Sequence, residues 1–404
     1  MKNSKLPCGA AGSLQGVRVL LHGTDNAGSV ASGFSSDMGA DVIHMESAGE
    51  PDPSRYDDGV YEQNHRNQRS IALDIDTSEG KTIFLRLLKD RDIFIASSPN
   101  NKWAVSDEEM WEQNPALVIV HITGFGRSAD PVWYTRPFTE EVGLAFSAVT
   151  ARNGLPDQAY GTNTGFCART AALYAVWGGL AAFYRAMATG EGESVDVAQV
   201  EVMWKAQSGD NYRYFNKGIV SKPTGNEDSM SACFRCFKCS DGEYVFIAMA
   251  GPAVIGKALA FFGFEYGSEL FPKKMPWVVQ GTEGAKLVTR AVEEFCAQRS
   301  STEVDKQLSA AGIPCSVVLS YESAARDPHY IARNVFTEWK TADDKTVKGL
   351  GFMPKAHNDP GKLWKPAPVW GENNEEVLEH LGYSPEDISA LYGKNIINKK
   401  RDHI

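Results

Sequence analysis

The chain has 404 residues, and 41 Lys and Arg against 51 Asp and Glu give it a net charge of −10. Hydrophobic residues make up 43% and charged residues 23%, a composition typical of a globular protein of roughly two to three domains and not of a fibrous or disordered one. The excess of acid argues against general binding to nucleic acid or to anionic membranes, because both need a positive surface.

Short β-branched runs alternate with helical patterns through the first third of the chain. We expect strands at residues 17–21, 41–45, 70–75, 92–96 and 116–122, and helices at residues 29–39, 78–89 and 107–113. This alternation predicts an α/β fold, with a parallel, Rossmann-like sheet covered by helices on both faces.

The loop after the first strand does not carry the Gly-x-Gly-x-x-Gly pattern that lets backbone approach a pyrophosphate. It reads Gly23-Thr24-Asp25-Asn26-Ala27-Gly28, with one glycine missing and an acid inside the loop. We therefore expect no bound dinucleotide and no dehydrogenase activity.

Residues 165–189 are almost continuously small and apolar, which predicts a helix buried on every face by close neighbours. The turn Thr189-Gly190-Glu191-Gly192 ends that helix, and a strand at 194–197 and a helix from Gln199 follow. Gly, Pro, Asn and Asp cluster after Lys217, so the first domain is predicted to cover residues 1–217.

Residues 218–320 are predicted to form a small α+β domain, with strands near 244–249 and 315–319. Cys233, Cys236 and Cys239 have the spacing of some metal sites. Apolar and basic residues alternate there before the turn Ser240-Asp241-Gly242, which indicates a half-buried hairpin strand, and we expect no metal. Residues 321–404 contain Pro-rich connections and a helix at 375–381, and are predicted to wrap over another surface.

Seven cysteines are too few for a disulfide framework in a chain of this length, and an odd number cannot all pair with one another. This count favours a reducing compartment. Residues 1–12 contain no continuous apolar run, and we expect no later stretch of the roughly 20 apolar residues that span a membrane. The prediction is a cytoplasmic protein.

Several separated motifs occur in the order found in one known family. They are Leu14–Leu20, Ala27-Gly28, Gly39–Ile43 with Glu46, Asp52–Arg55, Asn64–Ser70, Gly124–Gly126, Thr189–Val197, Gly312–Pro314, Asp327-Pro328 and Gly382-Tyr383. On these motifs, which cover nearly the whole chain, the sequence resembles the class III CoA-transferases, a family that includes carnitine, bile-acid and formyl-CoA transferases.

The resemblance implies a dimer of two interlocked rings, in which residues 321–404 return to the large domain and wrap the partner subunit. It also implies transfer of CoA from a thioester to a carboxylic acid. In the family one Asp attacks the thioester and forms a mixed anhydride and then an aspartyl-CoA thioester, so that one difficult exchange becomes two easier ones. Neither step uses a further cofactor; the CoA thioester is a substrate.

The family's nucleophilic Asp corresponds to Ala168 in this chain, counted back from Thr189 without a gap. A methyl group cannot be acylated, so no catalytic residue is assigned. Other positions also depart from the family. Pro99 and Trp103 replace expected CoA-binding cations, and Thr139, Leu144, Ala148 and Ser29 replace other active-site residues. These combined departures favour natural loss over a single engineered substitution.

The remaining candidates for contact with CoA or substrate follow from the same resemblance. They are Asn26, Ala27, His65, Arg66, Lys102 and Glu140. His65 and Arg66 could equally belong to a surface turn, and Asn26 could serve only the geometry of its loop.

This pattern predicts the non-catalytic subunit of a heteromeric CoA-transferase, paired with a homologous subunit that carries the Asp. It is similar in kind to succinyl-CoA:(R)-benzylsuccinate CoA-transferase of anaerobic toluene breakdown. The main alternative is a homodimeric carnitine- or bile-acid-type enzyme whose Asp is replaced by Ala168. A racemase is disfavoured because no clear acid–base pair is evident, and a scaffold that binds no thioester stays open.

Overall fold

The computed structural model describes residues 12–57, 59–97, 105–127, 130–134, 136–162, 165–207 and 209–399. Its internal contacts divide the chain into two compact units. Residues 1–149, 162–219 and 333–404 form the first unit, and residues 150–161 and 220–332 form the second.

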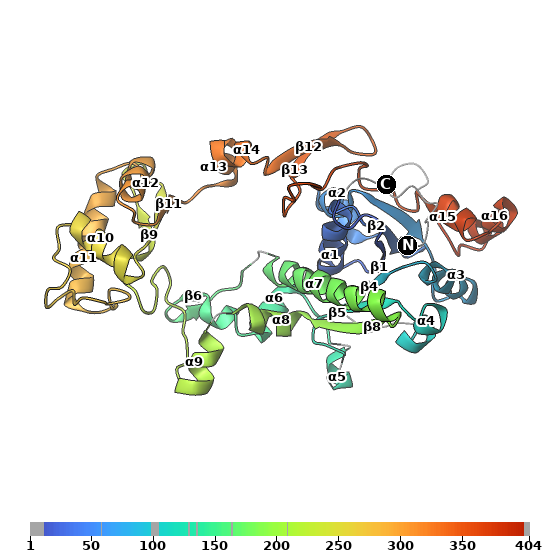
Figure 1. Ribbon diagram of the computed structural model, residues 1–404, viewed down its shortest axis with the longest axis horizontal. Coiled ribbons are helices and arrows are strands. Elements are labelled where there is room, and N and C mark those ends of the chain that lie inside the picture. Colours follow the sequence, from blue (N-terminus) through green and yellow to red (C-terminus); the bar gives the residue numbers. More distant parts are fainter. Residues whose placement is uncertain are drawn as a thin grey trace. The chain divides into compact units, whose positions relative to one another are not determined.

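A six-stranded parallel sheet forms the centre of the first unit, with strand order β3-β2-β1-β4-β5-β8 (Figure 1). The strands are β1 (Arg18–His22), β2 (Asp41–Glu46), β3 (Gln68–Ala72), β4 (Ile93–Ser97), β5 (Val118–Thr123) and β8 (Glu193–Ala198). Strand order reverses between β1 and β4, and in open parallel sheets the carboxyl ends of the strands at such a point border the ligand crevice. The predicted α/β fold with a parallel sheet is confirmed.

Helices cover both faces of this sheet, as the sequence predicts. Because successive side chains of a strand point to opposite faces, Leu20 packs in one hydrophobic layer and its neighbours Val19 and Leu21 pack in the other. The Leu20 layer contains α3 (Ser78–Leu88), α4 (Asp107–Gln113), α15 (Asn374–His380) and α16 (Pro385–Gly393). The Val19 layer contains α1 (Asn26–Asp37), α7 (Phe166–Thr189) and α8 (Gln199–Ala206).

The C-terminal segment covers the outer edge of β3. The Asn373 side-chain oxygen accepts a hydrogen bond from the Ser70 N–H at 3.0 Å, and the Asn374 side-chain oxygen accepts one from the Ala72 N–H at 2.9 Å. An edge strand otherwise presents unpaired N–H groups, so these two amides complete the sheet. Residues near both ends of the chain therefore build the first unit together.

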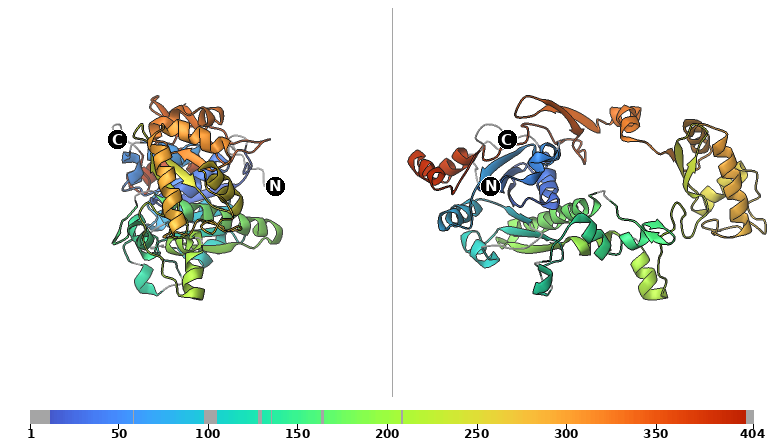
Figure 2. Two further views of the ribbon diagram at one scale, coloured as in Figure 1. Left: turned by 90° about the vertical axis from the view of Figure 1, so that its left-hand side faces the viewer. Right: turned by 180° about the vertical axis from the view of Figure 1, so that it is seen from behind.

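Smaller elements complete the first unit. They are η1 (Pro53–Tyr56), α2 (Val60–His65), α5 (Pro131–Tyr134), α6 (Glu140–Phe146), α9 (Asp210–Lys217) and the hairpin of β12 (Phe336–Lys340) and β13 (Thr346–Leu350). The hairpin and the segment after it lie far from α1 and α2 in sequence but next to them in space, as Figure 2 also shows.

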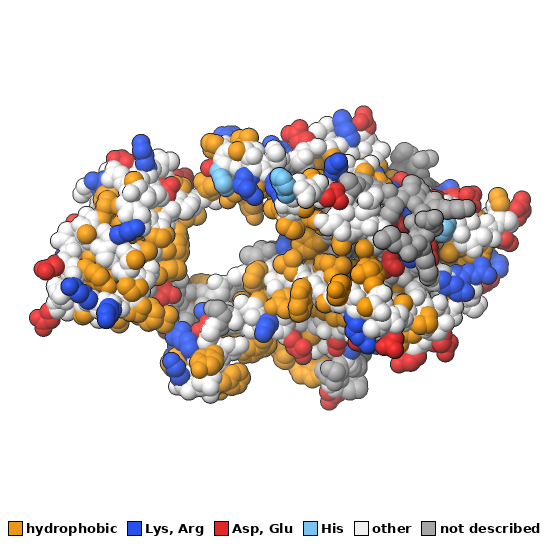
Figure 3. Space-filling model, in the orientation of Figure 1, with side chains coloured by type: hydrophobic (Ala, Val, Ile, Leu, Met, Phe, Trp, Pro, Cys, Tyr) orange, Lys and Arg blue, Asp and Glu red, His pale blue; other side chains and the backbone are white. Residues whose placement is uncertain are grey.

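Helix α7 differs from the expectation of burial on every face. Its small residues, among them Ala171, Ala175 and Gly179, pack against the sheet. Its large apolar residues lie on the opposite face, where Trp177 is 71% and Tyr184 76% exposed. Hydrophobic side chains gather over this helix in Figure 3. Small residues permit close packing on one side only, and the sequence pattern does not reveal which side is left uncovered.

By length and composition alone, α7 also meets the criterion for a membrane span, with a mean hydropathy of 1.2 over an 18-residue window. The expectation that no stretch reaches this criterion is therefore wrong. The small-residue face of α7 packs into the Val19 layer, as the buried face of a core helix does in a folded domain.

The second unit is built on a three-stranded antiparallel sheet in the order β11-β10-β9. Its elements are η2 (Thr150–Arg152), β6 (Gly154–Leu155), β7 (Gln158–Ala159), β9 (Phe234–Lys238), β10 (Tyr244–Ala248), α10 (Pro252–Phe261), α11 (Glu283–Ala297), α12 (Ser301–Ala310), β11 (Cys315–Val317), α13 (Tyr321–Arg326) and α14 (Pro328–Ala332). The cysteine run forms the predicted hairpin strand. Cys233 and Cys239 are buried in the core, and Cys236 lies on the other side of the strand.

Candidate functional site

A pocket of about 270 Å³ lies in the first unit near the point where the strand order reverses. It is bordered by the first loop, which follows β1, and by the beginning of α7. It is lined by Asp25, Asn26, Ala27, Phe138, Thr139, Glu140, Gly165, Ala168 and Gln199. Five residues singled out from the sequence, Asn26, Ala27, Thr139, Glu140 and Ala168, therefore meet in one place. No Lys or Arg is among the described lining residues.

The first loop is held tightly against the end of β4. Gly23 has a φ of +147°, and a Cβ atom there would lie 2.0 Å from the Ser97 carbonyl oxygen. The Asp25 side chain accepts hydrogen bonds from the Gly28 N–H at 3.0 Å and from the Ser97 hydroxyl, and so caps helix α1. Burial raises the pKa of Asp25. Both contacts fix this carboxyl group at one wall of the pocket.

Glu140 caps the first turn of α7 from a different element. Its Oε1 accepts a hydrogen bond from the Cys167 N–H at 2.7 Å, and its Oε2 accepts one from the Ala168 N–H at 3.0 Å. Gly165, the residue before the helix, has no side chain with which to cap it. Because the N-terminus of a helix carries partial positive charge, the carboxylate is favourable there.

No nucleophile is evident at the beginning of α7. Ala168 presents a methyl group that is 7% exposed. Its neighbour Cys167 is fully buried, and burial, followed by the nearby Glu140, raises the pKa of the thiol to about 12. A thiol with such a pKa stays protonated at neutral pH and does not attack a thioester.

Arg66 lies apart from this pocket and is not among its lining residues. Its Nε donates a hydrogen bond to Asp37 Oδ1 at 2.9 Å, one guanidinium nitrogen donates to Asp37 Oδ2 at 2.7 Å and the other to the Leu350 carbonyl oxygen at 2.6 Å. The side chain is 1% exposed. These contacts tie helix α1 to the hairpin of β12 and β13, and contact of Arg66 with CoA stays a prediction.

His65 is also buried and outside the pocket lining. It stacks against His44 and Tyr61, and its Nδ1 lies 3.1 Å from Gln68 Oε1. Contact of His65 with CoA likewise stays a prediction. Lys102, Pro99 and Trp103 lie outside the described residues.

Four lining residues were not selected from the sequence, namely Asp25, Phe138, Gly165 and Gln199. For Asp25 a signal was available, because an Asp directly before a run of small helical residues is a typical N-cap. Phe138 and Gln199 carry no comparable local signal, since only the fold brings them to the pocket.

A second, larger pocket of about 830 Å³ lies in the first unit between residues 51–62 and 341–399. Its cations are neutralised by acids: Arg55 pairs with Glu46, Lys345 with Asp343 and Lys399 with Glu375. None of the residues selected from the sequence lines it, so we take the smaller pocket as the candidate active site.

Known proteins resemble this chain over most of its length. The model of CoA-transferase family III matches residues 14–374. A bile acid CoA-transferase, BaiK, from Clostridium scindens is 38% identical over 95% of this chain and 89% of that protein. An L-carnitine CoA-transferase from Proteus mirabilis is 33% identical over 97% of this chain and 98% of that protein.

Solved structures share the fold. A CaiB/BaiF family protein from Brucella suis superposes with a TM-score of 0.76 at 23% identity, and covers 92% of this chain and 100% of that one. Rv3272 from Mycobacterium tuberculosis gives a TM-score of 0.77 at 21% identity, over 91% and 100%. The family match over most of the chain and the two relatives above 30% identity lead to one conclusion: the chain belongs to CoA-transferase family III.

Proposed function

We propose that this chain is the non-catalytic subunit of a heteromeric class III CoA-transferase, and that a homologous subunit bearing the Asp supplies the nucleophile. The observation that carries the proposal is Ala168, which stands in the candidate active site at the position where the family resemblance expects that Asp. The chain would then lend its fold to the complex, without an aspartyl intermediate of its own.

The other acids of the pocket are poor substitutes for the missing nucleophile. The two Glu140 oxygens each accept a backbone hydrogen bond from α7, and Asp25 is engaged by Gly28 and Ser97. Attack on a thioester needs a carboxylate oxygen free to approach the carbonyl carbon. Among the described lining residues there is also no cation to hold a phosphate or an anionic acyl group.

The exposed apolar face of α7 supports a partner subunit. Large hydrophobic residues recur along it at Phe166, Leu173, Trp177, Tyr184 and Met187, and each is more than half exposed. A row of this kind on a single chain commonly marks a protein interface. We propose that the homologous subunit covers it in an interlocked dimer or a heterotetramer.

As substrates we propose a donor such as succinyl-CoA and an acceptor such as (R)-benzylsuccinate, which would place the complex in anaerobic toluene degradation. We propose no further cofactor. A cytoplasmic location is supported by the cysteines, since the six within the described residues are all free thiols.

The proposal is tested by native mass spectrometry of the untagged assembly from its source cells, followed by dissociation and measurement of subunit masses. We expect a second subunit of different mass, and activity with succinyl-CoA only when both chains are present. Calorimetry of the isolated chain with CoA and succinyl-CoA tests the scaffold alternative, because measurable binding would count against it. A homodimer with Asp at 168 in its subunit mass would overturn the proposal.

The second candidate is a homodimeric carnitine- or bile-acid-type CoA-transferase that carries an inactivating Asp-to-Ala substitution at 168. It is favoured by the identities of 38% and 33% to enzymes named for those acids. The two proposals differ in what Ala168→Asp does to the isolated chain, because restoring one residue revives an enzyme that lost only that residue.

A further inference from the structure

Gln199 places a buried amide group at the candidate active site. It is the first residue of helix α8, its side chain lines the 270 Å³ pocket, and the residue is 3% exposed. Its backbone carbonyl oxygen accepts a hydrogen bond from the Cys167 thiol at 3.8 Å, but its side-chain amide has no hydrogen bond to any described residue. A buried amide without partners is unfavourable, because it has lost its hydrogen bonds to water and gained none in return.

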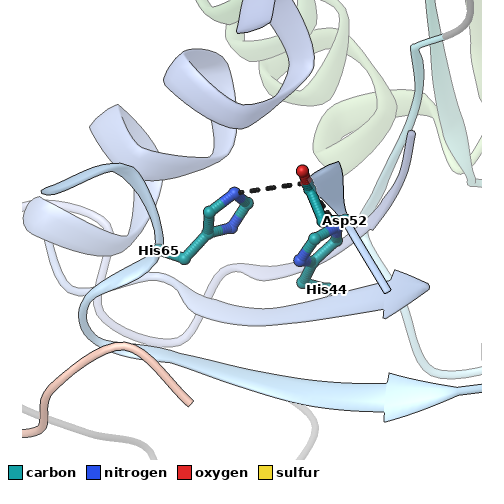
Figure 4. Close-up of side chains that lie close together, drawn as sticks. All are labelled: His44, Asp52 and His65. Atoms are coloured by element: carbon teal, nitrogen blue, oxygen red, sulfur yellow. Dashed lines mark ion pairs between the residues drawn. The ribbon is translucent and has the colours of Figure 1, made fainter. Parts of the chain in front are cut away.

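This amide differs from the other unpartnered polar groups of the first unit. His44, Asp52 and His65 lie side by side, and each has one side-chain atom that is closed off from solvent and lacks a partner among the described residues (Figure 4). None of these three residues lines either pocket described above. The Gln199 amide instead borders open space, so a ligand can reach it.

The charges around the pocket disfavour two classes of ligand. Asp25 and Glu140 supply two carboxyl groups, and a bound carboxylate would be repelled by them. Arg169 is not a lining residue but lies close by, since a Cβ atom on the lining residue Gly165 would come within 2.0 Å of its Nη1. An ammonium ligand would suit the acids, but it offers no acceptor to the Gln199 amide nitrogen, which is a donor.

A primary carboxamide matches both ends of the Gln199 side chain. One ligand N–H donates to Gln199 Oε1 while the ligand carbonyl oxygen accepts from Nε2, so that two hydrogen bonds form side by side. The same pairing forms whichever way the Gln199 amide is turned. A secondary amide in its ordinary trans form has its N–H and C=O on opposite sides, so it can make only one of these two bonds.

The size and the wall of the pocket suit a ring that carries one such group. A volume of 270 Å³ holds about nine water molecules at about 30 Å³ each, which is the size of a single ring with a carboxamide. Phe138 gives the pocket an aromatic wall, and its ring packs edge-on against Phe125 with centroids 5.5 Å apart. Apolar walls with a few polar groups that fix orientation are typical of small-molecule sites.

We propose that this pocket binds a small, uncharged primary carboxamide, and that Gln199 is the residue that recognises it. The inference goes beyond the proposed function, because it concerns the pocket of this chain alone. It holds whether the second subunit is a homologous chain or another copy of this one.

The test is a ligand-observed NMR titration of the full-length chain at neutral pH with three probes of similar size. Benzamide is the expected ligand, benzoate replaces the amide by a carboxylate, and N-methylbenzamide is a trans secondary amide. We expect benzamide to bind at least about tenfold more tightly than either of the others, as the loss of one buried hydrogen bond predicts. Benzoate also tests whether Arg169 outweighs the two acids.

The variant Gln199→Met removes the amide and keeps the shape of the side chain. It should weaken benzamide binding about tenfold or more, and bring the three affinities to within about threefold of one another. In the absence of ligand its urea midpoint should equal or exceed that of the wild type, because an unpartnered amide gives way to an apolar group.

The matched control is Gln207→Met. The Gln207 amide donates hydrogen bonds to the carbonyl oxygens of Ser147 at 2.7 Å and Met203 at 3.2 Å, so this variant should lower the urea midpoint and leave benzamide binding unchanged. The proposal is overturned by a wild type that binds benzamide no better than benzoate or N-methylbenzamide, or by unchanged benzamide binding in Gln199→Met. A lower urea midpoint for Gln199→Met would also overturn it, since the amide would then have a structural role.

Discussion

The N–H of Ala168 donates a hydrogen bond to the Glu140 carboxylate at 3.0 Å. This bond and its companion from Cys167 place an anion at the first turn of α7, where the family resemblance expects the nucleophilic Asp. Asp25 lines the same pocket. Any carboxylate introduced at position 168 therefore lies near two acids, and no Lys or Arg is among the described residues that line the pocket.

We predict that Ala168→Asp alone leaves the isolated chain without appreciable CoA-transferase activity. A carboxylate near Glu140 and Asp25 is disfavoured in its charged form, and it is the charged form that attacks the thioester. The measurement is CoA transfer from succinyl-CoA to a panel of carboxylic acids, with Ala168→Asn as the control. The two variants should differ by less than about tenfold in rate, or about 1.4 kcal/mol of barrier. A clear gain for Asp over Asn would contradict the non-catalytic assignment.

Glu140→Ala should lower the free energy of unfolding by about 1–2 kcal/mol. The substitution removes the cap from two N–H groups of α7, and caps of this kind contribute about that amount. Glu140→Gln keeps one acceptor oxygen and should lose less. Urea unfolding of the wild type and the two variants measures the order of their stabilities. If Glu140→Ala has the same free energy of unfolding as the wild type, water replaces the carboxylate without cost.

The parallel sheet was predictable because strands such as β2, β4 and β5 are buried runs that contain Val or Ile, and helical patterns lie between them. The bounds were less certain. Helix α1 begins at Asn26 and not at residue 29 because Asp25 caps it, and β3 ends at Ala72 because Leu73 instead forms a bridge with Ile397. The bridge between Leu73 and Ile397 joins residues that are distant in sequence, so no local pattern indicates it.

The candidate site was predictable only through the family resemblance. Ala168 and Asn26 carry no chemical signal of their own, and they meet because the first loop and the beginning of α7 lie at the same end of the sheet. The Arg66 contact with Asp37 and Leu350 could not be foreseen, since a basic residue in a polar motif suits a phosphate as well as a buried acid.

Arg66→Met should destabilise the chain by about 3–5 kcal/mol, because it leaves Asp37 and the Leu350 carbonyl without their partner in a buried setting. Arg185→Met is the control. That side chain is 48% exposed and pairs only with surface acids, so its loss should change stability by less than about 0.5 kcal/mol. Equal stability of the two variants would favour a ligand-binding role for Arg66.

The first unit should become less stable in acid, because protonation of Asp107 removes the charge of its carboxylate. Burial alone would raise the pKa of Asp107, but hydrogen bonds from His121, Arg127 and Ser194 hold it well below its usual range. A carboxyl group with a depressed folded-state pKa stabilises the fold above its unfolded-state pKa of about 3.8, and this contribution is lost as the pH falls below that value.

The Asp107 contribution can be isolated by comparing the wild type with Asp107→Asn. We expect the variant to be about 2 kcal/mol less stable near neutral pH and the difference to shrink as the pH approaches 2. Urea unfolding at a series of pH values provides the measurement. A difference that stays constant across this range would assign the effect to packing and not to charge.

Trp177→Asp should weaken subunit assembly without unfolding the chain. The indole is 71% exposed on α7 and packs against little within its own chain, so the free energy of unfolding should change by less than about 0.5 kcal/mol. If a partner covers this face, burying a charge at its centre should weaken the complex about thirtyfold or more, equivalent to about 2 kcal/mol.

Tyr56→Asp is the matched control, because Tyr56 is 65% exposed in the same unit but away from α7. Native mass spectrometry of each variant, mixed with the wild-type partner, measures the fraction assembled. Equal assembly of the two variants would place the interface elsewhere and remove the support that α7 gives to a heteromeric enzyme.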